Sequence, residues 1–273
     1  MKILCCGDVV GKSGRKVIED HIPDLRNRLG LDLVLVNGEN AAHGFGITEK
    51  ICKSFYGLGV DVITTGNHVW DQREIMNYID SDCRLLRPLN FPKNTPGRGS
   101  AVIETTGGKK VLVIHPMGRL FMEPLDDPFF GIDKALKGHT LGDTVDAIIV
   151  DMHADITSEK MAMGHYCDGR VSVVVGSHTH VPTADRQILP GGTAYQTDMG
   201  MCGDYDSVIG MIKQTAIARF TSKMPSGRLA PAEQDGTLCG VYVETDDKTG
   251  LARRIEAVRM GGRLAERIPE ITL

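Results

Sequence analysis

The chain has 273 residues, of which 41% are hydrophobic and 24% are charged, and its formal net charge is −4. This composition is typical of a globular α/β protein, and no apolar segment is long enough to cross a membrane. The small negative charge provides no broad basic surface for a long nucleic acid, so we expect any nucleotide partner to be small.

The start of the chain and the cysteines indicate where the protein works. Met1-Lys2 stands directly before a strand-like segment and lacks the apolar stretch of a signal peptide, which predicts a cytoplasmic protein. The seven cysteines are odd in number and form no Cys-x-x-Cys pair, which predicts reduced, packed thiols. We expect a single domain over residues 1–273, because α/β folds often reach this length as one unit.

The first half of the chain alternates predicted strands with predicted helices. A helix is expected over residues 12–29, where Pro23 suggests a kink or two short helices. Thr48 is a candidate N-cap for a second helix, which two glycines end. Residues 71–79 predict a third helix. This alternation is typical of parallel strands joined by crossover helices.

The second half has a different pattern. Residues 100–104 and 110–114 flank Gly107-Gly108 and predict an antiparallel hairpin, so we expect a mixed sheet. Residues 115–142 predict a long loop with a short helix near 129–136. The last expected elements are a helix and two closing strands: residues 207–220, 238–245 and 254–260.

Five short apolar segments end in clusters of polar side chains. Continuous apolar segments of this length are typical of strands buried on both faces of a sheet. If these strands lie side by side, their polar ends meet at one edge, where open α/β sheets place their active sites. The segments and their clusters are 2–6 before Gly7-Asp8, 32–36 before Asn37-Gly38-Glu39-Asn40, 60–64 before Gly66-Asn67-His68, 146–150 before Asp151-Met152-His153, and 171–175 before Gly176-Ser177-His178-Thr179-His180.

Each of these clusters has an ordinary structural explanation when it is taken alone. Asp8 could be a turn or helix-capping residue, and His68 or His153 could simply be hydrogen-bonded. His178 and His180 are the strongest local indication, because histidines two apart in an extended segment face the same way. Five strand ends that all supply Asp, Glu, Asn or His together indicate a metal site.

The types of donor atom limit which metals this site would bind. One Asp, one Glu, two Asn and three or four His offer oxygen and nitrogen without thiolate, which suits iron, manganese or zinc in a catalytic site. These donors are too many for one ion. Two cations about 3.5–4 Å apart, with a carboxylate and a hydroxide between them, are the arrangement that hydrolyses phosphate esters.

The ordered set of motifs resembles the calcineurin-like metallophosphoesterase family over nearly the whole chain, and it is similar to the bacterial YmdB-like branch. Asp8-Val9-Val10 departs from the Asp-x-His usual at the first strand, and Asn40 stands in for the missing histidine. Glu39 replaces the usual bridging aspartate. The segments that carry the resemblance to the branch are Gly7-Asp8-Val9-Val10-Gly11, Asn67-His68-Val69-Trp70-Asp71, His178-Thr179-His180-Val181-Pro182-Thr183-Ala184-Asp185 and Thr197-Asp198-Met199-Gly200-Met201.

The resemblance implies a fold and two metal ions. The implied fold is α/β, a β-sandwich of mixed sheets flanked by helices, with a dinuclear metal site at the carboxyl ends of the strands. Iron is the expected metal, and manganese and zinc are alternatives. One ion would be held by Asp8, Glu39, Asn40 and His180. The other would be held by Glu39, Asn67, His153 and His178.

The resemblance also implies a reaction. It points to a phosphodiesterase for small nucleotides, with 2′,3′-cyclic nucleotides as the substrate class. His68, which is left without a metal, would protonate the leaving alkoxide while a bridging hydroxide attacks phosphorus. Asp71 either orients His68 or caps the following helix.

A non-catalytic, metal-dependent nucleotide sensor is one alternative. Residues 115–142 would then report to partners through Phe121, Phe129 and Phe130, although these aromatics could equally pack the loop or form an oligomer contact. We expect a homo-oligomer and no membrane partner.

A P-loop nucleoside triphosphatase is a second alternative. The segment from Gly7 to Ser13 follows a strand and precedes a helix, and Asp151 is placed like a Walker B acid. The spacing argues against this alternative, because the motif has about four residues between its glycines and only three separate Gly7 from Gly11.

Overall fold

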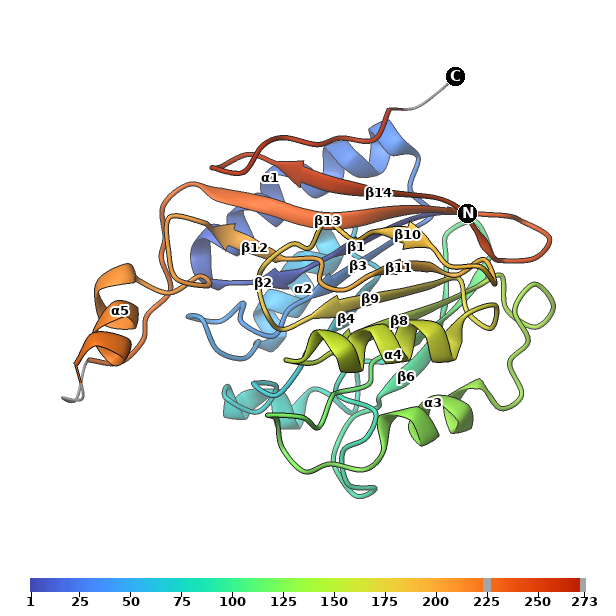
Figure 1. Cartoon of the computed structure of the whole chain (residues 1–273), viewed down its shortest axis with the longest axis horizontal. Helices are drawn as coiled ribbons and strands as arrows, with labels where there is room; N and C mark the ends of the chain where they lie inside the picture. Colours follow the sequence, from blue (N-terminus) through green and yellow to red (C-terminus); the bar gives the residue numbers. More distant parts are fainter. Residues whose placement is uncertain (223–226, 271–273) are drawn as a thin grey trace.

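Two β-sheets pack face to face in the computed structural model, which describes residues 1–222 and 227–270 (Figure 1). The strands of the first sheet are β1 Lys2–Cys6, β2 Asp8–Val9, β3 Leu33–Asn37, β4 Val62–Thr64, β5 Leu85–Leu86, β12 Met201–Asp204, β13 Gly236–Thr245 and β14 Ala252–Met260. Those of the second are β6 Ser100–Glu104, β7 Lys110–Ile114, β8 Ala147–His153, β9 Val173–Ser177, β10 Gln187–Ile188 and β11 Ala194–Gln196. The first sheet has the order β2-β12-β13-β1-β3-β4-β5 with β14 beside β13, and the second has the order β10-β11-β9-β8-β7-β6.

The described helices are α1 Gly11–Leu29, α2 Glu49–Gly57, α3 Pro128–Leu136, α4 Thr157–Cys167, α5 Lys213–Thr221 and the short 3₁₀ helix η1 Arg73–Asn77. Helices α1 and α2 cover the outer face of the first sheet, α3 and α4 cover that of the second, and α5 lies apart from both sheets (Figure 1). The predicted N-cap of α2 is confirmed, because the Thr48 side chain accepts a hydrogen bond from the main chain of Ile51 at 3.3 Å. None of the described helices has the length and apolarity needed to span a membrane.

Within the described part of the chain, three apolar clusters fill the spaces between these layers. Within β1, Ile3 and Cys5 point into the cluster between the two sheets, whereas Leu4 and Cys6 point into the cluster beneath α1 and α2. A third cluster lies between the second sheet and helices α3 and α4. Since both faces of these strands are buried, their sequences are continuously apolar rather than alternating. The layers run helix, sheet, sheet, helix, and the predicted sandwich flanked by helices is confirmed.

Both sheets are mixed, as predicted. Strand β1 runs parallel to β3 and antiparallel to β13. In the second sheet, β7, β8 and β9 are parallel, while β6 and β7 form the predicted antiparallel hairpin around Gly107-Gly108. The five strands with polar ends are divided between the sheets, with β1, β3 and β4 in one and β8 and β9 in the other. The expectation of one shared sheet edge is therefore wrong, and the polar ends meet between two edges.

The helix predictions need three corrections. Helix α1 continues through Pro23 as one element, so the expectation of two short helices is wrong. Pro23 lies on the exposed face, where water can bind the carbonyl that the proline leaves unpaired. Residues 71–79 form only the 3₁₀ helix η1. Helix α5 begins at Lys213 rather than residue 207, because Gly210 has φ 90°, which a right-handed helix does not contain.

Candidate metal centre

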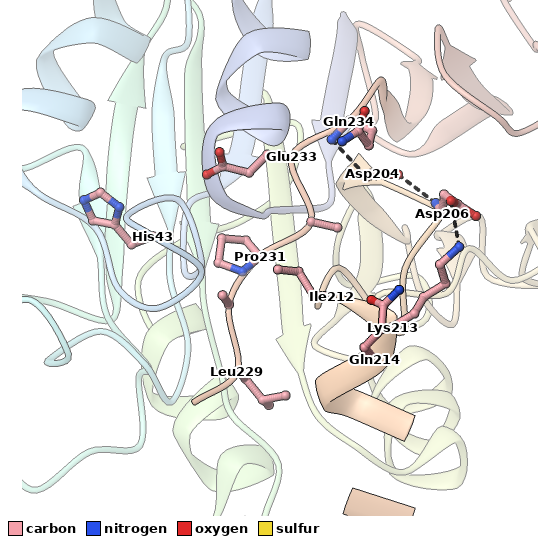
Figure 2. A pocket seen from close by; sticks show the side chains of 12 residues that line it. His43, Asp204, Asp206, Ile212, Lys213, Gln214, Leu229, Pro231, Glu233 and Gln234 are labelled. Atoms are coloured by element: carbon pink, nitrogen blue, oxygen red, sulfur yellow. Dashed lines mark hydrogen bonds and ion pairs between the residues drawn. The ribbon is translucent and has the colours of Figure 1, made fainter. Parts of the chain in front are cut away.

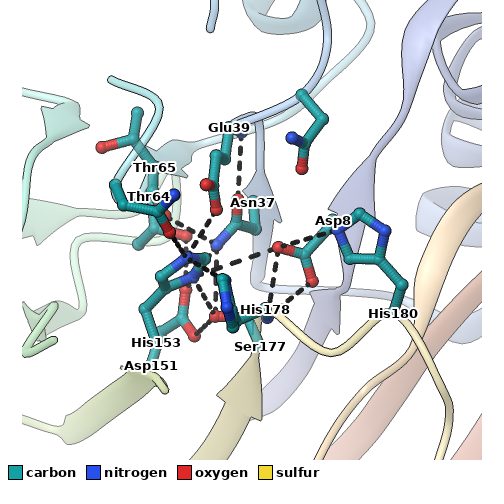
Figure 3. A network of polar contacts seen from close by, with 12 residues as sticks. Asp8, Asn37, Glu39, Thr64, Thr65, Asp151, His153, Ser177, His178 and His180 are labelled. Atoms are coloured by element: carbon teal, nitrogen blue, oxygen red, sulfur yellow. Dashed lines mark hydrogen bonds and ion pairs between the residues drawn. The ribbon is translucent and has the colours of Figure 1, made fainter. Parts of the chain in front are cut away.

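The ends of β3, β8 and β9 bring Glu39, His153 and His178 around one point (Figure 3), and Asn67 joins them from the end of β4. Nε2 of His153 lies 2.6 Å from Oε2 of Glu39 and 3.1 Å from Nδ1 of His178. The amide oxygen of Asn67 lies 3.2 Å from the same nitrogen. Glu39, His153 and His178 each offer a ligand atom within 4.8 Å of the others. A cation at this point would contact oxygen and nitrogen donors only.

A second group of predicted ligands adjoins the first. Oδ1 of Asp8 lies 4.0 Å from Nε2 of His180 and 4.0 Å from Nδ1 of His153. The Asp8 carboxylate also accepts the main-chain N–H of His178 at 3.1 Å. Asn40 donates its amide N–H to the carbonyl of Gly44 at 3.1 Å, which leaves its oxygen for another partner. His153 thus links the first group to Asp8 and His180, and Asn40 pairs with Val10, two residues after Asp8.

Two buried oxygen atoms at this centre have no hydrogen-bond donor. They are Oε2 of Glu39 and Oδ1 of Asn40. Although His153 Nε2 lies 2.6 Å from the Glu39 oxygen, the two atoms form no hydrogen bond. In the neutral tautomer that directs Nδ1–H at Ser177, the electron pair of His153 Nε2 faces this carboxylate oxygen. An unpaired buried carboxylate oxygen is costly, and a cation would satisfy it. The residues therefore fit a metal ion.

The histidine tautomers support the same conclusion. Ser177 Oγ donates to Asp151 at 2.7 Å, so it accepts from His153 Nδ1, which lies 3.0 Å away. His180 Nδ1 donates to the carbonyl of Ile209 at 2.8 Å. When each ring is neutral, these contacts leave the electron pair of Nε2 available to a metal ion at the centre.

Burial and neighbouring charges adjust the pKa values of these groups. Burial lowers the pKa of His178 to about 3, with a further contribution from His153, and burial also lowers the pKa of His180. Burial by itself would raise the pKa of Glu39, but His153 and the other histidines outweigh it and lower this pKa to about 2. The pKa of Asp8 is raised by burial and by nearby carboxylates. Neutral imidazoles beside crowded carboxyl groups are a donor set that a cation stabilises.

Gly66 keeps the centre open. A Cβ atom at this position would lie 2.2 Å from Nε2 of His153 and 2.3 Å from Oε2 of Glu39. Any side chain there would occupy the space between the two donors. Steric crowding therefore requires glycine at this position after β4, and the neighbouring sequence did not reveal this requirement.

His68, the predicted acid, lies at the edge of the centre rather than within it. Its Nδ1 lies 2.8 Å from Oδ2 of Asp71, and its ring contacts Phe45 edge-on at a centroid distance of 5.1 Å. Its Nε2 lies 4.0 Å from Glu39, and 30% of the side chain is exposed. Asp71 caps no helix, since η1 has Gln72 at its N-cap position. Of the two roles considered for Asp71, the contact favours orienting His68.

Several polar residues beneath the centre were not among the predicted site residues. Asp151 is fully buried and accepts hydrogen bonds from Ser177 at 2.7 Å and Thr64 at 2.6 Å, as well as from Asn37 at 3.3 Å. Burial opposes ionisation of Asp151, but His115 and these bonds lower its pKa to about 2. Thr64 and Asn37 belong to the first sheet and Asp151 to the second, so these contacts join the sheets (Figure 3). Side chains alternate along a strand, so Asp151 was expected on the same side as His153. This alternation could have identified Asp151 as a residue of the centre.

A large open hollow lies elsewhere on the molecule (Figure 2). Its volume is about 930 Å³, and its lining includes His43, Asp204, Asp206 and residues 229–234. No predicted ligand lines it, and neither does His68. Because the converging donors and the unpaired buried oxygens lie at the strand ends instead, chemistry is better assigned to the metal centre than to this hollow.

Comparison with known proteins gives a family and a group of relatives. The family model described as YmdB-like protein matches residues 4–258. A protein of Bacillus subtilis (strain 168) named 2′,3′-cyclic-nucleotide 2′-phosphodiesterase is 47% identical over 258 residues, which cover 94% of this chain and 96% of that protein.

Two solved structures have the same fold. The crystal structure of a hypothetical protein from Thermus thermophilus matches with a TM-score of 0.89 and 40% identity, over 96% of this chain and 100% of that one. A structure described as a novel phosphatase from Mycoplasma pneumoniae matches with a TM-score of 0.88 and 35% identity, over 96% of this chain and 93% of that one.

Proposed function

The chain belongs to the YmdB-like family of hydrolases, and on this premise we propose that it cleaves phosphodiester bonds of small nucleotides, with 2′,3′-cyclic nucleotides as the preferred class. The observation that carries the proposal is the meeting of Glu39, His153 and His178 around a buried carboxylate oxygen that has no donor. The name of the Bacillus relative supports the substrate class.

We propose two metal ions at this centre, with iron as the native metal and manganese or zinc as substitutes. When bound, such ions would neutralise charge on the phosphoryl group and lower the pKa of the attacking water. The residues proposed for the first ion are Asp8, Glu39, Asn40 and His180. Those proposed for the second are Glu39, Asn67, His153 and His178.

We propose His68 as the general acid. Its Nδ1 is engaged by the Asp71 carboxylate at 2.8 Å, which leaves Nε2 to carry the proton toward the leaving oxygen. Asp71 holds the ring in that orientation, and Phe45 restricts its rotation from the side. Because His68 is partly exposed, it can exchange its proton with solvent between turnovers.

We also propose that residues 1–273 work as one domain. Glu39 and Asn67 follow strands of the first sheet, whereas His153 and His178 belong to the ends of strands in the second. Neither sheet alone has the full donor set, so the two sheets need to fold together for the centre to form.

The decisive experiment measures turnover of a chromogenic phosphodiester and of 2′,3′-cyclic AMP with added Mn²⁺. We expect Glu39→Ala and His180→Ala to lose both turnover and full Mn²⁺ binding. His68→Ala should keep Mn²⁺ binding and lose about 10²–10⁴-fold in kcat, the usual size of a general-acid contribution. His165→Ala, which changes an exposed histidine on α4, is the matched control and should leave both quantities unchanged.

Two results would contradict parts of this proposal. Wild-type protein that binds Mn²⁺ but turns over neither substrate would favour the nucleotide sensor. Full activity in His68→Ala would remove His68 from the mechanism while leaving the metal centre in place.

A further inference from the structure

A buried ion pair lies behind the segment that carries His178 and His180. Nζ of Lys160, on helix α4, lies 2.6 Å from Oδ2 of Asp198. The Lys160 side chain is 1% exposed and the Asp198 side chain is fully buried. Lysine is almost never buried this deeply unless it is paired, and burying two charges is costly. The pair therefore needs an explanation beyond filling space.

The neighbouring segment has an unusual backbone. His178 has φ 95° and His180 has φ 66°, both in the left-handed region that favours glycine. Neither residue is a glycine, so both conformations are strained. Strain of this kind persists only where the surrounding structure holds it, and it is concentrated at functional sites.

Asp198 holds the middle of this segment. Its Oδ2 atom, the one paired with Lys160, also accepts the main-chain N–H of Thr179 at 3.2 Å and the Thr179 hydroxyl at 2.7 Å. Thr179 is the residue between the two strained histidines. One carboxylate oxygen thus anchors the centre of the strained segment from two directions.

Asp198 itself is firmly placed. Its other oxygen accepts the main-chain N–H of Gly200 at 2.8 Å, and its own N–H donates to the Thr183 hydroxyl at 2.9 Å. The preceding carbonyl, of Thr197, packs so closely on β9 that a Cβ at Gly176 would lie 1.8 Å from it. Because Asp198 is itself held in place, it can hold the segment that it binds.

We propose that the Lys160–Asp198 pair is a positioning device for the metal centre. Asp198 fixes Thr179, and Thr179 fixes the left-handed backbone that directs the imidazoles of His178 and His180 toward the cations. Lys160 pairs with the Asp198 carboxylate from the side of helix α4 and holds it in place. This inference rests on the metal-dependent function proposed above.

The test measures Mn²⁺ affinity by calorimetry and apoprotein melting separately. Thr179→Val removes the hydroxyl bond and keeps a β-branched side chain. We expect about a 10-fold weaker Mn²⁺ affinity, in line with the loss of an outer partner of a metal ligand, and a smaller drop in apoprotein melting temperature than in Asp61→Asn, because Asp198 keeps Lys160 and the Thr179 main-chain N–H. Thr179→Ser, which keeps the hydroxyl, should restore the affinity. Asp198→Asn should weaken it further, by up to about 100-fold.

Matched controls separate positioning from stability. Asp61 also pairs with a cation, Arg26, at 2.6 Å and accepts a main-chain N–H, from Val34 at 2.7 Å, but it lies before β4 rather than at its polar end. Asp61→Asn should lower the melting temperature and leave Mn²⁺ affinity unchanged. Thr221→Val, on exposed helix α5, should change neither quantity.

The outcomes are distinct. Thr179→Val with wild-type Mn²⁺ affinity would overturn the positioning role alone, and this variant decides the question even if Asp198→Asn fails to fold. A folded Asp198→Asn protein that behaves like Asp61→Asn, less stable but with unchanged affinity, would also overturn it. Wild-type protein without any Mn²⁺ binding would overturn the proposed function and this inference together.

Discussion

At the residue scale, the ring orientation of His153 and of His180 depends on the hydrogen-bond partner of the Nδ1 atom. His180 is held by the Ile209 carbonyl and His153 by Ser177, whose hydroxyl in turn donates to Asp151. Outer contacts of this kind orient a ligand and make it a better electron-pair donor. The buried carboxylate of Asp151 therefore acts on the centre through one serine hydroxyl.

Ser177→Ala tests this chain of contacts. The variant leaves His153 Nδ1 without its acceptor, so the ring can turn or change tautomer, and Mn²⁺ affinity should fall about 10–100-fold. Stability should fall by about 1–3 kcal/mol, because buried polar groups lose a partner. Calorimetric titration with Mn²⁺ and urea unfolding of the apoprotein measure the two effects.

Ser172→Ala is the matched control. Ser172 is also buried, and its hydroxyl accepts the main-chain N–H of Ile148 at 3.0 Å. It lies directly before β9, so it is at the opposite end of the β8–β9 pair from Ser177. We expect a comparable loss of stability with unchanged Mn²⁺ affinity. Equal affinities in the two serine variants would show that Ser177 has no role in ligand orientation.

At the element scale, the turns that follow the strands shape the centre as much as the strands themselves do. The turn after β4 carries Gly66 against the centre, and the segment after β9 carries two non-glycine residues in left-handed conformations. Strands β4 and β9 bring these segments together from different sheets. At Gly66, the missing side chain leaves the space between His153 and Glu39 free.

Gly66→Ala should therefore abolish Mn²⁺ binding without unfolding the protein. The new methyl group would stand 2.2 Å from His153 Nε2, so the imidazole or Glu39 has to move away. The cost in folding free energy should be about 1–3 kcal/mol, as for other overpacked sites. Calorimetry and thermal unfolding check the two expectations. Gly57→Ala, where a Cβ meets nothing within 4 Å, is the control and should retain full binding.

At the scale of the whole molecule, the centre joins two sheets that pack through an apolar cluster. The carboxylates of Asp8, Glu39, Asp151 and Asp198 are all buried between or beside these sheets. Hydrogen bonds from Thr64 and Asn37 to Asp151 cross from one sheet to the other. Charges gathered in this way repel one another in the apoprotein, and a bound cation relieves the repulsion.

Metal removal should consequently lower the stability of the whole fold. Mn²⁺ at about 100 times its dissociation constant should stabilise the native state by about 2.7 kcal/mol, and EDTA should reverse the effect. Differential scanning fluorimetry with and without EDTA measures the shift. Glu39→Ala should melt at the same temperature in both conditions, and a metal-dependent shift in this variant would argue against Glu39 as a ligand.

Local features of this protein follow from its amino-acid sequence alone. The continuous apolar segments identified strands buried on both faces, Thr48 identified a helix start, and Gly107-Gly108 identified a hairpin. The polar clusters after the strands also followed from the sequence, since the residue types that bind metals are visible in the chain. These features depend on side-chain chemistry and on neighbours a few residues apart, which a single sequence displays directly.

How these parts meet depends on contacts between distant segments, which the sequence does not display. The tertiary structure divided the strands between two sheets, joined Lys160 to Asp198, and placed Ser177 between Asp151 and His153. It also kept α1 continuous through Pro23 because that residue faces solvent. Strand pairing and buried polar contacts join residues far apart in the chain, and their free energy depends on burial that no local pattern encodes.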